Sequence, residues 1–297
     1  MTEPAPPPVE ARDAGRALAA GRGDAPPAME VRVASQPGTE GAVNDDCAVS
    51  GPGFVAVLDG VTVPEGTRTG CVHGPAWYVR RLATALLAGD ADNPGEPLPE
   101  LLAGAIRTVR DSHGAGCDLD HPGTPQATVT LLRAAGPYAD YLVLCDSPLL
   151  LRRGGRVEVV TDPRHTRVVE QLGAMPPGGT PARLRAQVEF QRRYANQPGG
   201  YWIAAADPGA ARHAVTGRVP LSGADRLTDA ALLTDGASCA VAYGLCDWAG
   251  LLDVLAGRGP YHLIALVRDA ERSDPECRRW PRLKRHDDAT AVYCRFS

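Results

Sequence analysis

The sequence predicts an α+β fold built around mainly antiparallel sheet. Short apolar strands follow one another across tight turns such as Gly154-Gly155, which is the pattern of successive hairpins. Strands and helices come in separate groups rather than in strict alternation, and this favours α+β over a doubly wound α/β fold. With 297 residues, 44% of them hydrophobic, the chain is long enough to fill a substantial core.

The first strands are expected to include a hairpin. Strand-like apolar runs occur at 31–35, 47–50 and 54–58. Gly and Pro residues supply turn chemistry between the last two runs. A turn centred on Pro52 pairs Asp46 with Leu58 when the residues are counted outward. Asp46 and Asp59 are therefore expected side by side at the open end of this hairpin.

The remaining elements follow from periodicity and turn residues. Helices are predicted at about 74–89 and 98–113, followed by strands at 127–134, 140–145, 148–152 and 156–161. The pattern then loosens, with a polar helix near 181–195, and we interpret about 163–230 as an inserted flap. It recovers with a strand at 231–234, helices near 237–257 and 260–273, and a closing strand at 289–294.

The domain organisation follows from composition. Residues 1–28 are rich in Pro, Ala and Gly and have no sustained apolar period, so we expect a disordered leader there. Residues 29–297 contain no internal repeat and are expected to form one compact domain that carries the flap. Only Lys284 is a lysine among the 31 basic residues.

Charge and cysteine usage narrow the functional class. The net charge of −4 provides no broad positive field, so nucleic acid is not expected as a partner. No apolar run approaches the roughly 20 residues that cross a bilayer, which argues against a membrane span. The eight cysteines are scattered from Cys47 to Cys294 without a CxxC pair or a secretory signal. We expect free thiols and a cytoplasmic protein; the oligomeric state is left open.

Aspartates recur where apolar strands end. Asp59-Gly60, Asp146-Ser147 and Asp235-Gly236 each follow such a strand, and Asp287-Asp288 opens the last one. One Asp-Gly after a strand usually marks a turn, and scattered caps and turns remain an alternative for the whole set. Carboxylates crowded at one end of a sheet are tolerated when a divalent cation neutralises them. Oxygen ligands favour Mg²⁺ or Mn²⁺ over zinc.

The order of these motifs resembles that of the protein phosphatase 2C family of metal-dependent serine/threonine phosphatases, over about residues 29–297. The matching segments are Asn44-Asp45-Asp46, VAVLDG at 55–60, GTPQATVTLL at 123–132, CDSPLLLRRGGRVEVVTDPRH at 145–165, LLTDGAS at 232–238 and HDDATAV at 286–292. The resemblance is to a divergent bacterial-type member. It implies a four-layer α-β-β-α sandwich of two mainly antiparallel sheets flanked by helices.

The same resemblance implies a metal site. The residues that match its ligands to two Mn²⁺ or Mg²⁺ ions are Asp46, Asp59, Asp235, Asp287 and the carbonyl of Gly60. Asp146 matches the aspartate associated with a weaker third ion. Of the closing pair, we expect Asp287 to be the ligand and Asp288 to orient backbone, because adjacent side chains on a strand point to opposite faces. Two such cations activate a water for attack on a phosphate monoester, and no protein nucleophile is needed.

Several positions depart from the family pattern. Gly41 stands where many members have a phosphate-binding arginine, and Arg68, Arg80 and Arg81 are the weak substitutes. The usual histidine general acid after Asp-Gly is missing, and His73 is the nearest replacement, although a lone histidine at such a position is more often a helix-end or core residue. Cys145 and Pro148 replace the glycine and arginine of the family's Gly-Asp-Ser-Arg.

The function expected from these residues is hydrolysis of phosphoserine or phosphothreonine in a phosphoprotein substrate through a metal-activated water. Asp46, Asp59 and Asp146 are expected to serve catalysis as well as metal binding. One alternative is a non-catalytic regulatory or binding domain that keeps the metal for folding. Another is a phosphatase for a small metabolite, which an altered phosphate pocket would allow.

Overall fold

The computed structural model describes residues 28–63, 66–171, 186, 188–189 and 192–297. The expected leader, residues 1–28, lies outside this description apart from Ala28. The middle of the expected flap, including most of the polar helix near 181–195, also lies outside it.

The described residues form two five-stranded sheets in which every strand pair is antiparallel. One sheet contains, in spatial order, β1 (Met29–Gln36), β10 (Ala289–Phe296), β9 (Leu227–Leu233), β6 (Leu149–Arg153) and β7 (Arg156–Val160). The other contains β2 (Asp46–Gly51), β3 (Phe54–Gly60), β4 (Ala127–Ala135), β5 (Tyr138–Leu144) and β8 (Val215–Pro220). The first sheet thus joins the two ends of the described chain.

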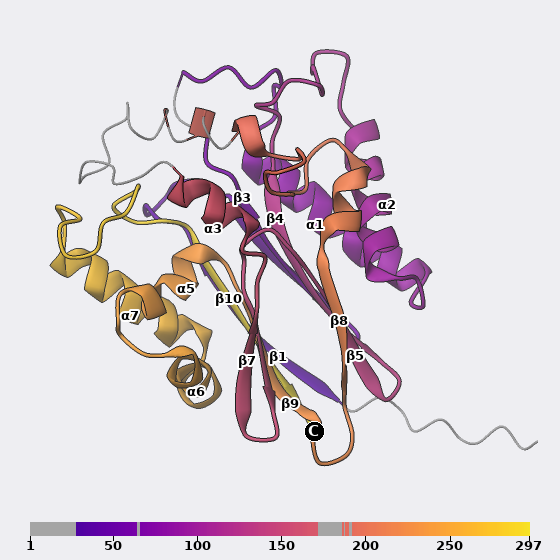
Figure 1. Cartoon of the computed structure of the whole chain (residues 1–297), viewed down its shortest axis with the longest axis vertical. Coiled ribbons are helices and arrows are strands. Elements are labelled where there is room, and N and C mark those ends of the chain that lie inside the picture. Colours follow the sequence, from indigo (N-terminus) through magenta and orange to yellow (C-terminus); the bar gives the residue numbers. More distant parts are fainter. Residues whose placement is uncertain (1–27, 64–65, 172–185, 187, 190–191) are drawn as a thin grey trace, which may run out of the picture.

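Helices cover the outer face of each sheet (Figure 1). The β2-β3-β4-β5-β8 sheet is covered by α1 (Pro75–Asp92) and α2 (Leu98–Asp111). The other sheet is covered by α5 (Asp235–Ala242), α6 (Trp248–Arg258) and α7 (Pro260–Ser273). Two shorter helices, α3 (Arg164–Glu170) and the 3₁₀ turn η1 (Pro208–His213), belong to the segment between β7 and β8. The predicted α+β fold and its four-layer sandwich are confirmed.

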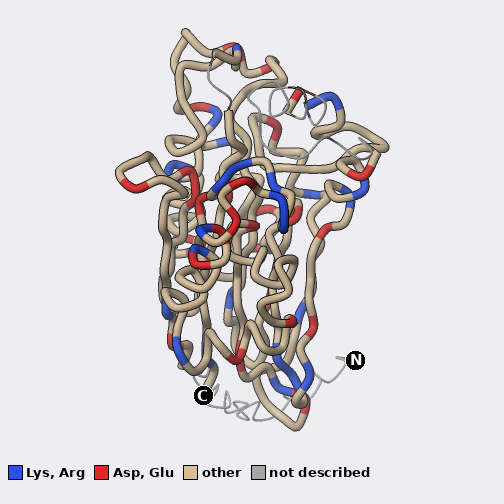
Figure 2. The backbone as a smooth tube through the Cα atoms, turned by 90° about the vertical axis from the view of Figure 1, so that its left-hand side faces the viewer, with Lys and Arg blue, Asp and Glu red and all other residues tan. Residues whose placement is uncertain are grey.

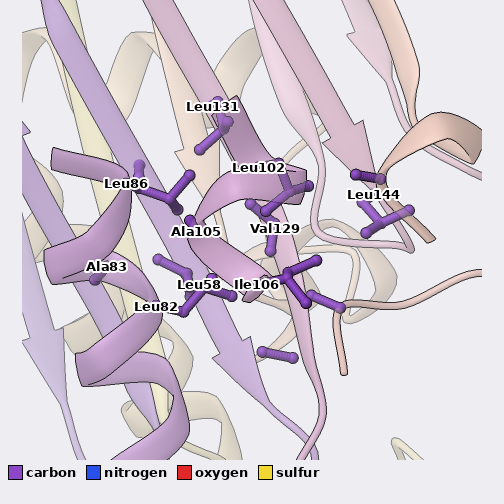
Figure 3. Packing of buried hydrophobic residues seen from close by; sticks show 14 of the residues in the cluster. Leu58, Leu82, Ala83, Leu86, Leu102, Ala105, Ile106, Val129, Leu131 and Leu144 are labelled. Carbon is purple, nitrogen blue, oxygen red and sulfur yellow. The ribbon is translucent and has the colours of Figure 1, made fainter. Parts of the chain in front are cut away.

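Three apolar layers hold the sandwich together. Leu82 and Leu86 lie one helical turn apart on α1. Together with Ile106 of α2, they pack on Leu58 and Val129 of the sheet beneath them (Figure 3). A second layer fills the space between the sheets, and a third lies under α5, α6 and α7. Burying one such leucine contributes about 1.5–3 kcal/mol, so each layer is a substantial part of the folding free energy.

Strand β3 has both faces in the core. Phe54, Ala56 and Leu58 face the helices, whereas Val55 and Val57 face the other sheet. This explains its unbroken apolar run, because a strand between two covered faces needs no polar side. The strand leaves the core only at its end, where Asp59 follows.

The predicted register of the first hairpin was wrong by one residue. Gly51 pairs with Phe54, so the turn has two central residues, Pro52 and Gly53, rather than one. Gly53 has a φ of +71°, the left-handed conformation that a Pro-Gly turn requires at its second central position. The consequence is that Asp46 pairs directly with Asp59.

The sequence also gave no signal for β8, which lies inside the segment interpreted as a flap and pairs with β5. Gly217 and Pro220 weaken the strand pattern, yet both suit an edge strand. A side chain at Gly217 would collide with the ring of Tyr141, so the glycine is needed for close packing. Likewise β9 begins at Leu227, four residues before the predicted strand.

The helix predicted near 237–257 is two helices. Gly244 has a φ of +68° just after α5, and Leu245 N–H donates to the carbonyl of Ala240, which closes the first helix. The side chain of Asp247 then accepts from Gly250 N–H at 2.8 Å and starts α6.

Charge is distributed without a large field of one sign on the face that Figure 2 shows, where basic and acidic residues are interspersed along the chain. Within the part of the chain that the structure describes, no helix has the length and apolar character needed to cross a membrane.

Candidate metal centre

The aspartates predicted at strand ends come together at one end of the sandwich. Asp59 lies at the end of β3, directly opposite Asp46 at the start of β2. Asp235 is the first residue of α5, immediately after β9 of the other sheet. Asp287 lies in the connection that enters β10. The site therefore bridges the two sheets.

Hydrogen bonds tie the two sheets together at this point. The hydroxyl of Thr234 donates to Asp46 Oδ2 at 2.8 Å, and the backbone N–H of Asp235 points to Asp59 Oδ2 at 3.4 Å. Thr290 N–H donates to the Thr234 hydroxyl at 2.9 Å, which orients that hydroxyl towards the carboxylate. The carboxylates of Asp46 and Asp59 are thus held by residues that are distant from them in sequence.

A cavity of about 120 Å³ opens between these elements. Of the residues predicted for the site, those that line it are Asp59, Gly60, Asp146, Asp235 and Asp287. Asp46 does not line the cavity, but it is buried, pairs with Asp59 across the hairpin and is repelled by Asp235 and Asp287. The structure thus brings together every aspartate predicted for the site.

The carboxylates are crowded together. Burial raises the pKa of Asp46 to about 8, and repulsion from Asp235 and Asp287 adds to this despite the hydrogen bond from Thr234. Burial, then Asp287 and Asp146, raise the pKa of Asp235 to about 7. The pKa of Asp59 is raised well above its usual range for the same reasons. Such a group favours a compensating cation.

The donor set fits Mg²⁺ or Mn²⁺. Its side chains offer carboxylate oxygens, which hard divalent cations prefer, and several of them face one small cavity. The raised pKa values come first from burial and then from mutual repulsion, and a bound divalent cation would offset both. Zinc sites of the structural kind use cysteine and histidine instead.

The glycines of the two Asp-Gly motifs are required by close packing rather than by turn geometry. A Cβ at Gly60 would lie 2.5 Å from the carbonyl oxygen of Asp45. A Cβ at Gly236 would collide with the carbonyl oxygen of Asp288. Neither glycine has a positive φ. The motif therefore lets backbone from distant segments approach the aspartates.

Asp287 and Asp288 have different surroundings. Asp287 lines the cavity, whereas the carboxylate of Asp288 accepts from the backbone N–H groups of Gly38 at 2.8 Å and Asp45 at 2.7 Å. Both residues precede β10, which begins at Ala289, so the expectation that they open the strand was wrong and strand alternation does not separate them. Their hydrogen bonds do.

His165 is a cavity residue that sequence reasoning missed. Its Nδ1 lies 2.5 Å from Asp146 Oδ2. Burial lowers the pKa of His165, but Asp146, Asp235 and Asp162 together raise it by more, so the pKa lies above its usual value. Burial in turn raises the pKa of Asp146, but the charge and hydrogen bond of His165, together with hydrogen bonds from Cys145 and the backbone, lower it by more, so the pKa lies below its usual value. The only sequence signal was a histidine in the turn that begins with Asp162-Pro163.

Cys145 explains one departure from the family pattern. Its φ is +72°, a conformation that glycine adopts freely and that costs another residue about 1–2 kcal/mol. The left-handed backbone turns the chain so that Asp146 enters the cavity at the end of β5. The family's glycine at this position is thus replaced by cysteine without loss of the turn.

Lys284, the chain's one lysine, is a cationic residue that lines this cavity. Its Nζ forms an ion pair with Asp287 Oδ1. Burial lowers the pKa of Lys284, but Asp287, Asp235 and Asp59 raise it by more, so the pKa lies above its usual value. The ammonium is therefore charged and faces the cavity.

The other expected substitutes lie elsewhere. Arg80 and Arg81 are exposed on α1, and Arg68 lies in the connection before it; none of the three lines the described cavity. Gly41 lies in an exposed turn with a φ of +76°. His73 contacts two cysteines outside the cavity, so the structure does not support it as a general acid.

Several solved structures with a similar fold are phosphatases. The serine/threonine phosphatase PstP/Ppp of Mycobacterium tuberculosis aligns with a TM-score of 0.58 and 17% identity, over 91% of this chain and 99% of its own. The PPM phosphatase MsPP of Mycobacterium smegmatis, in complex with cacodylate, aligns with a TM-score of 0.54 and 17% identity, over 91% and 100%. The described chain has the fold of the PPM serine/threonine phosphatases.

A third structure, the catalytic domain of PstP in complex with two manganese ions, aligns with a TM-score of 0.53 and 16% identity, over 90% of this chain and 98% of its own. No family model and no curated protein matches the sequence. The resemblance seen in the motifs is thus confirmed at the level of the fold.

Proposed function

We propose that this chain is a metal-dependent phosphomonoester hydrolase that removes phosphate from phosphoserine or phosphothreonine in proteins. The observation that carries the proposal is the convergence of Asp59, Asp235 and Asp287 on one cavity, from both sheets of a PPM phosphatase fold. The manganese ions named for PstP support the choice of Mn²⁺ or Mg²⁺.

We assign Asp46, Asp59, Asp235 and Asp287, with the carbonyl of Gly60, to two cations, and Asp146 to a weaker third. When bound, these cations would supply charge neutralisation and a water of lowered pKa. The chain's own residues do the rest. Lys284 offers an ammonium to the phosphate dianion. It would thus replace the phosphate-binding arginine that many family members have at the position of Gly41. His165, held by Asp146, keeps a proton at the cavity wall.

We assign control of access to this cavity to the flap, residues 163–230. Its described portion supports a role in shaping the site, because His165, Tyr201 and Ile203 line the cavity. The remaining sequence-based expectations are kept as proposals: a single domain over 29–297, a cytoplasmic location, and no nucleic-acid or membrane partner.

The test is hydrolysis of p-nitrophenyl phosphate and of a phosphothreonine peptide with Mn²⁺, Mg²⁺ or EDTA. An active phosphatase shows metal-dependent turnover that Asp235→Asn lowers by at least about a hundredfold. Turnover of the peptide at a higher kcat/KM than a set of phosphorylated metabolites supports a protein substrate. Binding of Mn²⁺ without turnover of any phosphoester would favour the regulatory-domain alternative instead.

A further inference from the structure

Two loops beside the acidic cavity carry a second cluster of metal-ligand residues. One loop joins β3 to α1, and the other joins α2 to β4. The backbone N–H of Asp118 donates to the carbonyl of Gly70 at 2.7 Å, which holds the loops side by side. Cys71 and His73 project from the first loop and Cys117 from the second.

The three ligand atoms form an almost equilateral triangle. Cys71 Sγ lies 3.3 Å from Cys117 Sγ. His73 Nδ1 lies 3.4 Å from the first sulfur and 3.5 Å from the second. All three side chains are half-buried. The function proposed for the aspartate site uses none of them.

The two sulfur–nitrogen distances match one face of a tetrahedral zinc site, and the sulfurs would move apart by about 0.5 Å to bind the ion. Zn–S bonds of about 2.3 Å and Zn–N bonds of about 2.0–2.1 Å at tetrahedral angles place two sulfurs about 3.8 Å apart and sulfur and nitrogen about 3.5 Å apart. A disulfide instead requires a separation of about 2.05 Å between the sulfurs, and it gives the histidine nitrogen no reason to lie equally close to both.

His113 is the candidate for the fourth position. Its Nδ1 lies 2.9 Å from the carbonyl oxygen of Val109, the second contact that metal-binding histidines usually make. Its Nε2 is buried and has no hydrogen-bond partner among the described residues. The imidazole rings of His73 and His113 lie 5.1 Å apart at 85°. His113 lies outside the group of ligand atoms that are within 4.8 Å of one another, so its side chain must move towards the cluster to complete the site.

Trp77 covers the same cluster. Its ring stacks on His73 with centroids 3.9 Å apart and contacts the edge of His113 at 4.7 Å. An apolar cover of this kind limits access of water and chelators to a bound ion. The aromatic ring, two imidazoles and two thiols thus form one contiguous, half-buried group from two loops and a helix.

We propose that Cys71, His73 and Cys117 bind a structural zinc ion, with His113 as the fourth ligand. The ion cross-links the two loops at the end of the sandwich that carries the acidic cavity. Val61 and Thr62 of the first loop line that cavity, so the zinc fixes part of its border without taking part in phosphate chemistry. Binding releases the thiol protons, because thiolates are the ligands.

The test is zinc content of the purified full chain after dialysis against a weak chelator, measured by plasma mass spectrometry. We expect about one zinc per chain in the wild type and less than about a tenth in Cys71→Ser and Cys117→Ser. Cys246→Ser is the matched control, because the thiol of Cys246 is also half-buried but does not belong to the cluster. This variant should keep the ion. Asp235→Asn should keep it too, which separates this site from the aspartates.

A second measurement uses the wild type and so does not depend on how the variants fold. Cobalt(II) added to metal-free wild type should give a thiolate-to-cobalt charge-transfer absorption that zinc removes. His113→Ala should weaken zinc binding by about 10–100-fold, and unchanged binding would remove His113 from the site. The proposal is overturned if the wild type holds no zinc and gives no such absorption, or if its cysteines resist alkylation and its mass is lower by two hydrogens, the signature of a Cys71–Cys117 disulfide.

Discussion

Lys284 makes the acidic cavity different from a plain group of carboxylates. Its ammonium pairs with Asp287 and stands where a phosphate oxygen can reach it. Replacing it with glutamine removes the charge and keeps much of the length of the side chain. We expect Lys284→Gln to lower kcat/KM for a phosphopeptide by about 10–1,000-fold, the range for loss of one stabilising donor.

The comparison with Lys284→Arg makes this prediction specific. Arginine keeps the positive charge and contacts phosphate in a bidentate manner, so activity should recover in part. Mn²⁺ affinity, followed by calorimetry, should not fall in Lys284→Gln, because a competitor for Asp287 has been removed. Equal activity of the glutamine variant and the wild type would contradict a phosphate-binding role.

The adjacent pair Asp287 and Asp288 gives a second residue-level prediction. Asp287→Asn should abolish metal-dependent turnover, since it removes a carboxylate that lines the cavity. Asp288→Asn should keep most of the turnover but lower the free energy of unfolding by about 1–3 kcal/mol, because its carboxylate accepts two backbone N–H bonds. Urea denaturation and initial rates, measured on both variants, separate the roles; the reverse assignment would appear as an inactive Asp288→Asn.

At this scale the sequence was informative about charges and much less so about their partners. Asp59, Asp146 and Asp235 each follow an apolar strand, so the carboxylates could be predicted. His165 and Lys284 have no such pattern around them. Their roles depend on which loops meet at the cavity, and that is a property of the tertiary fold. His73 was predicted at the site because it is near Asp59 in sequence, yet it faces another cluster.

Helix α5 depends on the space that Gly236 leaves at its first turn. The helix begins at Asp235, and the carbonyl of Asp288 packs directly against the α-carbon of Gly236. Gly236→Ala would therefore push α5 away from the segment that carries Asp287. We expect a loss of about 1–3 kcal/mol in the free energy of unfolding, as for other overpacked positions, together with weaker Mn²⁺ binding.

Gly257 provides a matched control for that experiment. It lies within α6, and a Cβ there would meet no atom within 4 Å. Alanine is about 0.5–1 kcal/mol more favourable than glycine inside a helix, so Gly257→Ala should be neutral or stabilising. Thermal denaturation of both variants checks the pair. A Gly236→Ala protein as stable as the wild type would show that α5 tolerates the displacement.

Elements were predicted well where one periodicity governs them. Strand β3 and helix α7 were placed correctly because burial dictates each side chain. The turn of the first hairpin was misjudged, since a one-residue shift changes register but leaves the apolar pattern unchanged. Strand β8 was missed because an edge strand with Gly217 and Pro220 has a weak pattern, and its identity depends on its pairing with β5.

Aspartates gather at the junction of the two sheets, and their ionisation makes the stability of the whole molecule depend on pH and on bound metal. In the metal-free protein the pKa of Asp235 is about 7 and that of Asp46 about 8, against 3.8 as the ordinary value. These groups are protonated in the folded chain and ionised in the unfolded chain between those values. The folded state then binds more protons, so the free energy of unfolding falls as pH rises.

The last prediction follows from that sign. The stabilisation by each protonated aspartate is present in full below about pH 3.8 and is lost as pH rises through 7 to 8. Asparagine at position 235 does not ionise. In EDTA, the Tm of Asp235→Asn should therefore rise relative to that of the wild type from pH 5 to pH 8. With Mn²⁺ the direction reverses, because the ion binds the ionised carboxylates and its affinity rises with pH. Thermal denaturation of both proteins at four pH values, with and without Mn²⁺, measures this. A difference in Tm that stays constant from pH 5 to pH 8 in EDTA would mean that Asp235 is ionised in the metal-free fold and that the carboxylates tolerate one another without a cation.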